Sequence, residues 1–285
     1  MISYYMINGK IVPIEEALIR IQDLGLLRGY GIFDFFPIMK GRLVFINDYY
    51  DRFYSSAKKM QLVPPLSRAD LSNDIYSLIG KNGEEDGYIR LVLTGGDAPD
   101  GFSPQRNNLY ILQYPAIHNN SAIYEKGVKL TLQKFQRERP DVKTLNYANA
   151  LRHRKLIEDL GAIDVLYHDG RNVHETSRAN FFIVDKRGII HTTADTVLSG
   201  ITRSHLIQVA AEHYPILELS LTLADLLEAE EAFLTSTTKG VLPVTKIDNL
   251  AIGSGIPGPV TQHLSKLFDR YVEEHVRSAL ELKSP

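Results

Sequence analysis

Short apolar runs joined by tight turns open the chain. The segment YYMINGKIVP has two such runs on either side of Asn8-Gly9, and FDFFPIMKGRLVFI has two more on either side of Lys40-Gly41. A glycine-containing pair of turn residues between two apolar runs favours a tight hairpin. The pattern therefore predicts two β-hairpins before residue 47.

The apolar positions then change to a helical period. Tyr49, Phe53, Ala57 and Met60 recur at steps of three and four residues, which indicates an amphipathic helix, and residues 67–79 predict a second one. The runs GYIRLVLTG and NLYILQYP return to β character, separated by a loop rich in Gly, Pro and Asp. The first half is expected to be a sheet with helices beside it.

The polar segment PAIHNNSA, residues 115–122, interrupts both periodicities. We expect a small α+β domain at residues 1–116, a linker at 117–123 and a larger second domain at 124–285.

The second half alternates strands and helices. GVKLTLQKF reads as a strand, and NYANALRHRKLIEDLG as a helix with Ala148, Leu151, Lys155 and Leu156 along one side and Gly161 as its C-terminal cap. Further strands, turns and helices are predicted at DVLYHDGRNVHE, NFFIVDKRGIIHTT, TRSHLIQVAAEHY, EEAFLTSTTKGVLPV and the segment that starts at PVTQHL.

Composition narrows the partners. The 285 residues include 32 Lys and Arg against 34 Asp and Glu, a formal net charge of -2, so no charge excess points to nucleic acid or an anionic membrane. There is no cysteine, which excludes disulfides, thiolate metal sites and cysteine nucleophiles. The start of the chain lacks the pattern of a signal peptide, and no apolar run reaches membrane-spanning length. A small-molecule ligand and a cytoplasmic location are the expectations.

Three familiar signatures carry little weight. GSGIPG fits G-x-G-x-x-G at Gly253, Gly255 and Gly258, but too little chain follows for a dinucleotide-binding unit. SSAK at residues 55–58 matches S-x-x-K without its companion motifs and is better explained as a helix surface. The nine histidines, His153, His168 and His174 among them, lack the spacing of a zinc site, so no metal is expected.

Five blocks in the second half, in this order, resemble one family: VKTLNY, NVHETSRANFF, LSGITR, TSTTKGVLPV and IGSGIPGPVTQHL. They resemble the fold type IV, or class IV, pyridoxal-phosphate aminotransferases, which include branched-chain aminotransferase, D-amino-acid aminotransferase and aminodeoxychorismate lyase. RGYGIFDFF and DRFYSSAKKM in the first half extend the resemblance over nearly the whole chain. It implies a two-domain α+β fold with a larger, β-barrel-like second domain and pyridoxal 5′-phosphate at the domain junction.

The resemblance also implies roles for single residues. Lys143 would bind the cofactor aldehyde through its amine and then move a proton between the substrate and the cofactor. Glu175 would keep a proton on the cofactor's pyridine nitrogen, because an adjacent negative charge favours the cationic ring. The remaining cofactor contacts fall on Arg52, Asn180, Ile201, Thr202, Ser236, Thr237 and Tyr147, the last four places after the lysine where the branched-chain enzyme has its tyrosine at five.

The substrate contacts are less uniform across the family. GYIRLV resembles the branched-chain enzyme and makes Tyr88 and Arg90 candidates for carboxylate binding, on one face of a strand because they are two residues apart. Phe33, Phe35 and Phe36 could line an apolar pocket, and Thr238 is a further candidate. The arginine expected of the D-specific enzyme is missing from residues 91–105, which weakens that alternative.

The sequence thus predicts reversible amino transfer between an apolar, branched-chain-like amino acid and a 2-oxo acid such as 2-oxoglutarate. D-amino-acid aminotransferase, aminodeoxychorismate lyase and a non-enzymatic ligand-binding protein stay open as alternatives. Family members are usually homodimers, so a homodimer is expected.

Overall fold

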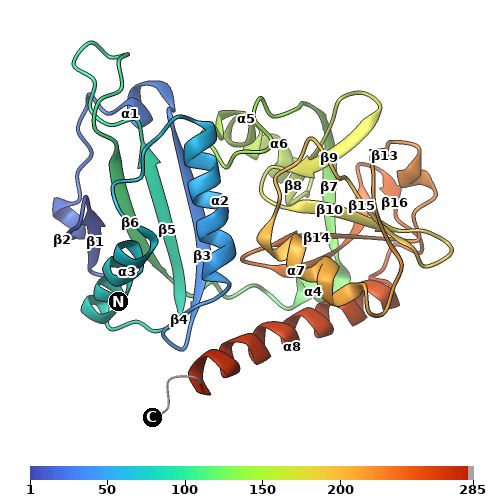
Figure 1. The fold of residues 1–285 in the computed structure, drawn as a ribbon. Helices are drawn as coiled ribbons and strands as arrows, with labels where there is room; N and C mark the ends of the chain where they lie inside the picture. The colour runs from blue at the N-terminus through green and yellow to red at the C-terminus, as the bar shows by residue number, and fades with distance from the viewer. Residues whose placement is uncertain (282–285) are drawn as a thin grey trace. The chain divides into compact units, whose positions relative to one another are not determined.

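The computed structural model describes residues 1–281, which form an α+β chain (Figure 1). The chain divides into two compact units. The first contains Met1–Ile117, Val142–Asn146 and the end of the last helix from His275, and the second contains His118–Asp141 and Tyr147–Glu274.

The first unit is built on an antiparallel six-stranded sheet in the order β2-β1-β6-β5-β3-β4. Its strands are β1 (Tyr4–Ile7), β2 (Lys10–Pro13), β3 (Gly31–Met39), β4 (Arg42–Leu43), β5 (Gly87–Thr94) and β6 (Asn108–Pro115). Both predicted hairpins are confirmed, and their turn residues Asn8-Gly9 and Lys40-Gly41 have positive φ. Such turns match the twist of the strands that they join.

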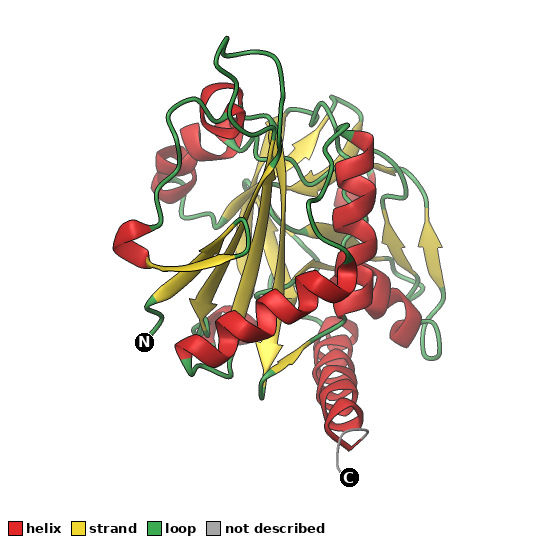
Figure 2. Cartoon of the chain, turned by 60° about the vertical axis from the view of Figure 1, so that its left-hand side comes forward, coloured by secondary structure: helices red, strands yellow, loops and turns green. Residues whose placement is uncertain are grey.

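Helices cover one face of this sheet. The unit contains η1 (Ile14–Glu16), α1 (Leu24–Arg28), α2 (Ile46–Lys59) and α3 (Arg68–Asn82). Figures 1 and 2 show α2 and α3 lying across the same side of the sheet. Tyr49, Phe53 and Ala57 of α2 are buried, as their helical spacing predicts. The other face of the sheet carries the side chains described below.

A five-residue piece of chain from beyond the predicted linker also belongs to the first unit. Thr144 forms an isolated antiparallel bridge with Ile32, and the amide of Phe33 donates to the carbonyl of Lys143 at 2.9 Å. The amide of Leu145 donates to Gly31 at 3.0 Å. The sequence placed this segment in the second domain, whereas its backbone adds to the edge of β3. The expected linker at 117–123 also overlaps the first turn of α4 (Ala122–Lys126).

The second unit is built on a ten-stranded mixed sheet. Its main path runs β12-β11-β10-β14-β15-β7-β8-β9-β13, with β16 paired to β15. The strands are β7 (Val128–Lys134), β8 (Asp164–His168), β9 (Asn172–Thr176), β10 (Asn180–Val184), β11 (Ile190–Thr192), β12 (Ile216–Glu218), β13 (Leu221–Thr222), β14 (Glu231–Ser236), β15 (Gly240–Ile247) and β16 (Leu250–Ala251). Leu130, Leu166, Phe181 and Leu242 lie in its apolar core.

Helices complete the described part of the second half. They are α4, α5 (Ala148–Arg152), α6 (Arg154–Asp159), α7 (Ile201–Ala210) and α8 (Pro259–Glu281), together with the 3-10 turn η2 (Asp225–Leu227).

The prediction of one continuous helix over residues 146–161 was wrong, because the structure has two short helices, α5 and α6, separated at His153. Nδ1 of His153 lies 2.7 Å from the carbonyl oxygen of Asn149, which the amide of His153 would need in an unbroken helix. The chain therefore restarts as α6, and Leu151 and Leu156 are exposed.

Candidate active site

One face of the first unit's sheet is aromatic and half-buried. The register pairs Phe35 with Arg90 and Tyr88 with Tyr114, so these side chains lie on the same face of β3, β5 and β6, as the spacing of Tyr88 and Arg90 predicts. Phe35 stacks on Tyr88, with ring centroids 4.9 Å apart. Burial raises the pKa of the Tyr88 phenol, so this hydroxyl stays protonated at neutral pH.

Arg90 is held on this face by rings. Its guanidinium carbon lies 5.4 Å from the ring centroid of Phe33, 5.3 Å from that of Phe35 and 5.2 Å from that of Tyr114. Aromatic faces attract a guanidinium without using its hydrogen-bond donors. Nε of Arg90 is buried and has no hydrogen-bond partner within residues 1–281. The side chain is therefore fixed in place with a donor still to be satisfied.

Lys143 shares one of these rings. Its Nζ lies 4.8 Å from the centroid of Phe33, the ring that Arg90 also contacts. The backbone bond between Phe33 and Lys143 fixes this arrangement, because it anchors the lysine beside β3. An amine and a guanidinium thus flank one phenyl ring.

The opposite face of β3 is closed. Phe36 is fully buried against Tyr49, so its proposed place in an apolar substrate pocket is wrong, whereas Phe33 and Phe35 alternate to the other face. Asp34 is also buried and receives two hydrogen bonds from Arg52, Nε to Oδ2 at 3.0 Å and Nη2 to Oδ1 at 2.6 Å. This bidentate pair fixes the direction of the Arg52 guanidinium.

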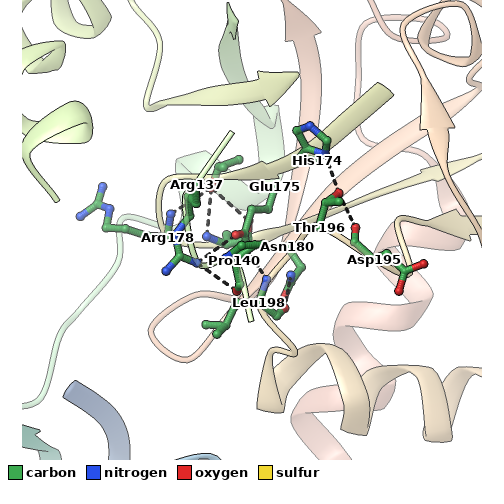
Figure 3. A network of polar contacts seen from close by, with 11 residues as sticks. Arg137, Pro140, His174, Glu175, Arg178, Asn180, Asp195, Thr196 and Leu198 are labelled. Atoms are coloured by element: carbon green, nitrogen blue, oxygen red, sulfur yellow. Dashed lines mark hydrogen bonds and ion pairs between the residues drawn. The ribbon is translucent and has the colours of Figure 1, made fainter. Parts of the chain in front are cut away.

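In the second unit, Glu175 on β9 is buried and engaged at both oxygens (Figure 3). Arg137 Nη1 donates to Oε1 at 3.1 Å, and the amide of Leu198 donates to Oε2 at 3.1 Å. Arg137 also donates to the carbonyl of Pro140 at 3.4 Å. A buried carboxylate is stable when such partners compensate for lost water.

Asn180 on β10 holds the approach to α7. Its Nδ2 donates to the carbonyl of Leu198 at 2.8 Å. A Cβ on Gly200 would meet Oδ1 of Asn180 at 2.1 Å, so only glycine fits there. Gly200 is the N-cap of α7, and the amides of Ile201 and Thr202 open the helix. Amides at a helix start lack intrahelical acceptors and favour an anion.

Ser236, the last residue of β14, adds a hydroxyl group that fits a phosphate. The Oγ atoms of Thr235 and Ser236 are buried and have no partner in the part of the chain that the structure describes. The next residues are anchored from α4 and its approach: Asn119 donates to the carbonyl of Thr238 at 2.7 Å, and Tyr124 donates to that of Lys239 at 3.0 Å. The residues of the second unit therefore suit a phosphorylated cofactor, with an unsatisfied hydroxyl, a helix start and a glycine that leaves room.

Known proteins match this chain over almost all of its length. Residues 31–247 match the family described as amino-transferase class IV. The chain belongs to the class IV aminotransferases.

Relatives within the class differ in their named substrates. The D-alanine aminotransferase of Listeria monocytogenes serotype 1/2a is 31% identical over 288 residues, covering 98% of each chain. The branched-chain amino acid aminotransferase of T.th., solved with pyridoxamine 5′-phosphate, is 25% identical with a TM-score of 0.88 and covers 96% of this chain and 95% of its own. The branched-chain aminotransferase of Thermoproteus uzoniensis, solved with norvaline, is 26% identical with a TM-score of 0.81 over 94% of each chain.

Sequence reasoning about this class IV aminotransferase missed Arg137 and Tyr167. Tyr167 on β8 is buried, and burial raises its pKa, with Asp164, Arg137 and Glu175 as nearby charges. Arg137 follows β7 in the segment FQRERP, where the one available signal was its place just after a strand. Tyr147, by contrast, was expected at the cofactor, and the structure places it at the N-cap of α5, half-buried.

Metal-binding side chains are not grouped in residues 1–281. No set of three His, Cys, Asp or Glu side chains there could hold a metal ion. No helix in the same range combines the length and apolar character needed to cross a bilayer.

Proposed function

We propose that this class IV aminotransferase transfers the amino group of an apolar α-amino acid to a 2-oxo acid such as 2-oxoglutarate. The observation that carries the proposal is the pair of cations on Phe33: Nζ of Lys143 at 4.8 Å and the Arg90 guanidinium at 5.4 Å from the ring centroid. An α-amino acid has its carboxylate one bond from the carbon that loses a proton. A guanidinium close to the catalytic amine suits that geometry.

Pyridoxal 5′-phosphate is the cofactor, and when bound it supplies an electron-accepting ring that stabilises negative charge at the substrate α-carbon. Lys143 would hold it through the side-chain amine, and the same amine would act as the base that moves the α-proton of the substrate. Glu175 accepts a hydrogen bond from the protonated ring nitrogen. Arg137 forms an ion pair with that carboxylate at 3.1 Å and holds it in position.

The phosphate contacts are divided among backbone, hydroxyl and guanidinium donors. The amides of Ile201 and Thr202 donate from the start of α7, and the Ser236 hydroxyl has no other partner within residues 1–281. Thr237 follows Ser236 as the first residue of the turn after β14. Arg52 adds a charged donor whose direction Asp34 sets.

The substrate contacts fall on the aromatic face. Arg90 binds the carboxylate, and Phe33 and Tyr88 flank the side chain, which favours apolar groups. Thr238 and Tyr147 are the remaining proposed contacts, the first to the substrate and the second to the cofactor hydroxyl.

Two donors fit these contacts. The branched-chain L-amino acids are one, since Tyr88 and Arg90 match the pattern of that branch and the solved neighbours carry that name. D-alanine is the other, supported by the 31% identity over 98% of the chain to the Listeria enzyme. Residues 91–105 contain no arginine to bind the substrate carboxylate of a D-amino acid. Arg90 would supply that contact in its place, so the absence does not exclude D-alanine.

A spectroscopic half-reaction tests the function. The protein with added cofactor is reduced with borohydride, and its mass is measured by mass spectrometry. Separate samples that are not reduced receive L-leucine, D-leucine, L-alanine, D-alanine or L-glutamate while the cofactor absorbance is followed. Conversion by L-leucine supports the branched-chain donor, and conversion by D-alanine without L-alanine supports the D donor. A protein that forms no reducible lysine adduct with added cofactor contradicts the proposal.

The lyase alternative needs no amino acceptor, so pyruvate released from aminodeoxychorismate alone would favour it. A homodimer and a cytoplasmic location complete the proposal. Sedimentation of the purified protein tests the first.

A further inference from the structure

The loop before α7, residues 193–200 and here called the cup loop, is tied to β9 and β10 at successive points. Thr193 Oγ1 donates to the carbonyl of Val173 at 2.8 Å, and Thr196 Oγ1 lies 2.8 Å from Nδ1 of His174. The Leu198 amide donates to Glu175. Three consecutive residues of β9 thus hold three positions of the loop, and Figure 3 shows two of them, Thr196 beside His174 and Leu198 beside Glu175.

One of these positions is conformationally strained. Thr196 has φ of +65°, in the left-handed region that β-branched residues avoid. Its hydroxyl also donates to the carbonyl of Asp195 at 2.5 Å, so it accepts from His174. Strain of this kind persists only where neighbouring contacts determine the conformation. The bond from His174 is such a contact.

His174 has no other polar partner in the described chain. The ring is buried, and its Nε2 has no hydrogen-bond partner among residues 1–281. The bond from Nδ1 assigns the neutral tautomer with its proton on Nδ1, because a second proton would be buried without an acceptor. The one polar function of this side chain is therefore to hold Thr196.

Asn180 completes the attachment at the end of the loop. It holds the carbonyl of Leu198, and its Oδ1 lies against Gly200, the N-cap of α7. The amide and the carbonyl of Leu198 are thus both taken by side chains from the sheet. These contacts fix the two residues before Ile201, and so they restrict the first amides of α7.

We propose that His174 and Asn180 are positioning residues that fix the cup loop, and through it the α7 amides that bind the cofactor phosphate. This inference rests on the proposed function, because it presumes a phosphate at those amides. Neither side chain needs to touch the cofactor, which revises the expectation of a direct contact from Asn180. The consequence is specific: these residues act on the phosphate end of the cofactor and not on its ring.

The test compares pyridoxal 5′-phosphate with pyridoxal, which lacks the phosphate. Dissociation constants for both are measured on the apoprotein from the absorbance of the lysine adduct. His174→Leu removes the bond to Thr196, and we expect about tenfold weaker binding of pyridoxal 5′-phosphate with pyridoxal unchanged. Asn180→Ala should act in the same direction. His174→Asn places an amide donor near the Nδ1 position and should restore most of the affinity.

A matched control is His191→Leu. His191 lies on β11, two residues before the cup loop, but its ring pairs with Asp185 at 3.1 Å and not with the loop, so the ratio of the two constants should not change. Hydrogen exchange of the apoprotein gives a readout without cofactor: residues 196–202 should exchange faster in His174→Leu than in His191→Leu.

Equal losses for the two cofactors, or no loss for either, would overturn the inference. A misfolded variant would show exchange that is raised throughout the second unit, in which case Asn180→Ala and His174→Asn decide the outcome. If the wild-type protein bound neither cofactor, the proposed function would be contradicted. If the wild type bound both cofactors and the variants bound them equally well, only the positioning role would be contradicted.

Discussion

The two units hold their charged site residues in opposite ways. In the first, the cations of Arg90 and Lys143 lie against aromatic rings, and Arg90 Nε has no partner within residues 1–281. In the second, both oxygens of Glu175 accept hydrogen bonds from the protein. Ring contacts hold a guanidinium without using its hydrogen-bond donors, whereas hydrogen bonds to both oxygens hold the carboxylate. The difference separates Arg90, proposed to bind the substrate, from Glu175, proposed to bind the cofactor, while Lys143, proposed to act on both, shares the ring contact of Arg90.

Arg52 sharpens this comparison within the first unit. Two of its donors are taken by Asp34, and its side chain is 11% exposed. It is therefore held by hydrogen bonds as Glu175 is, and its guanidinium also lies over a ring as that of Arg90 does, 5.2 Å from the centroid of Tyr49. The bidentate pair with Asp34 supports the proposal that Arg52 binds the cofactor, and the ring contacts of Arg90 support the proposal that it binds the substrate.

The largest effect is expected at Lys143. Lys143→Ala removes the amine that bonds the cofactor and transfers the proton, so turnover should fall by about 10³-fold or more. Mass spectrometry after borohydride reduction should show no cofactor adduct on the variant. Lys155→Ala, an exposed lysine of α6, is the control and should keep both adduct and turnover. A reduced adduct on the Lys143 variant would exclude its assigned role.

The next effect is expected at the fixed carboxylate. Glu175→Gln keeps the shape but loses the charge that retains the proton on the ring nitrogen, so we expect amino transfer to slow by roughly 10²-fold while the lysine adduct survives. Single-turnover absorbance measures the rate. Glu158→Gln on α6, whose side chain is 62% exposed, is the control. Equal rates for Glu175→Gln and wild type would place the ring nitrogen elsewhere.

Arg90 should give a smaller and more selective effect. Arg90→Met removes the carboxylate anchor but keeps a long side chain over the rings, so kcat/KM for an α-amino acid should fall by about 10- to 100-fold. A primary amine without a carboxylate should react equally with variant and wild type. Arg154→Met, at a 76% exposed side chain, is the control. If the amine lost as much as the amino acid, Arg90 would not bind the carboxylate.

The local parts of this picture were predictable from sequence. The turn at Asn8-Gly9, the buried face of α2 and the shared face of Tyr88 and Arg90 depend on neighbours within a few residues. The alternation along β3 could also have separated Phe36 from Phe33, because side chains two residues apart share a face and those three apart do not.

Non-local contacts were not predictable from one sequence. The pairing of Thr144 with Ile32 joins positions more than one hundred residues apart, and it moves Lys143 into the first unit. The ion pair of Arg137 and Glu175 crosses 38 residues. The hydrogen bond between His174 and Thr196 likewise leaves no periodic pattern in the sequence, because it links a strand to an irregular loop.

The smallest expected effect is a pH dependence that arises from that hydrogen bond. Burial lowers the pKa of His174 below its ordinary value of 6.5; His168 acts in the same direction and Asp169 opposes them. The pKa of His174 is lower when the ring is bonded to Thr196 than when that bond is broken. Below pH 6.5, His174 therefore binds more protons in the state without the bond. The hydrogen bond from His174 to Thr196 therefore contributes its full stability above pH 6.5, and this contribution is lost as the pH falls through the lowered pKa.

Affinity for pyridoxal 5′-phosphate should decline below pH 6.5 more steeply than affinity for pyridoxal, by at most roughly one power of ten per pH unit for a single proton. The phosphate of the cofactor also titrates in this range, so the wild-type curve alone does not isolate His174. His174→Asn cannot take up that proton, and the difference between its curve and that of the wild type is the contribution of the histidine. Superimposable curves for the two proteins would mean that the charge of His174 does not affect how the cup loop is held. The contrast between the hydrogen-bonded cofactor residues and the ring-held substrate residue would then depend on Glu175 and Arg52 alone.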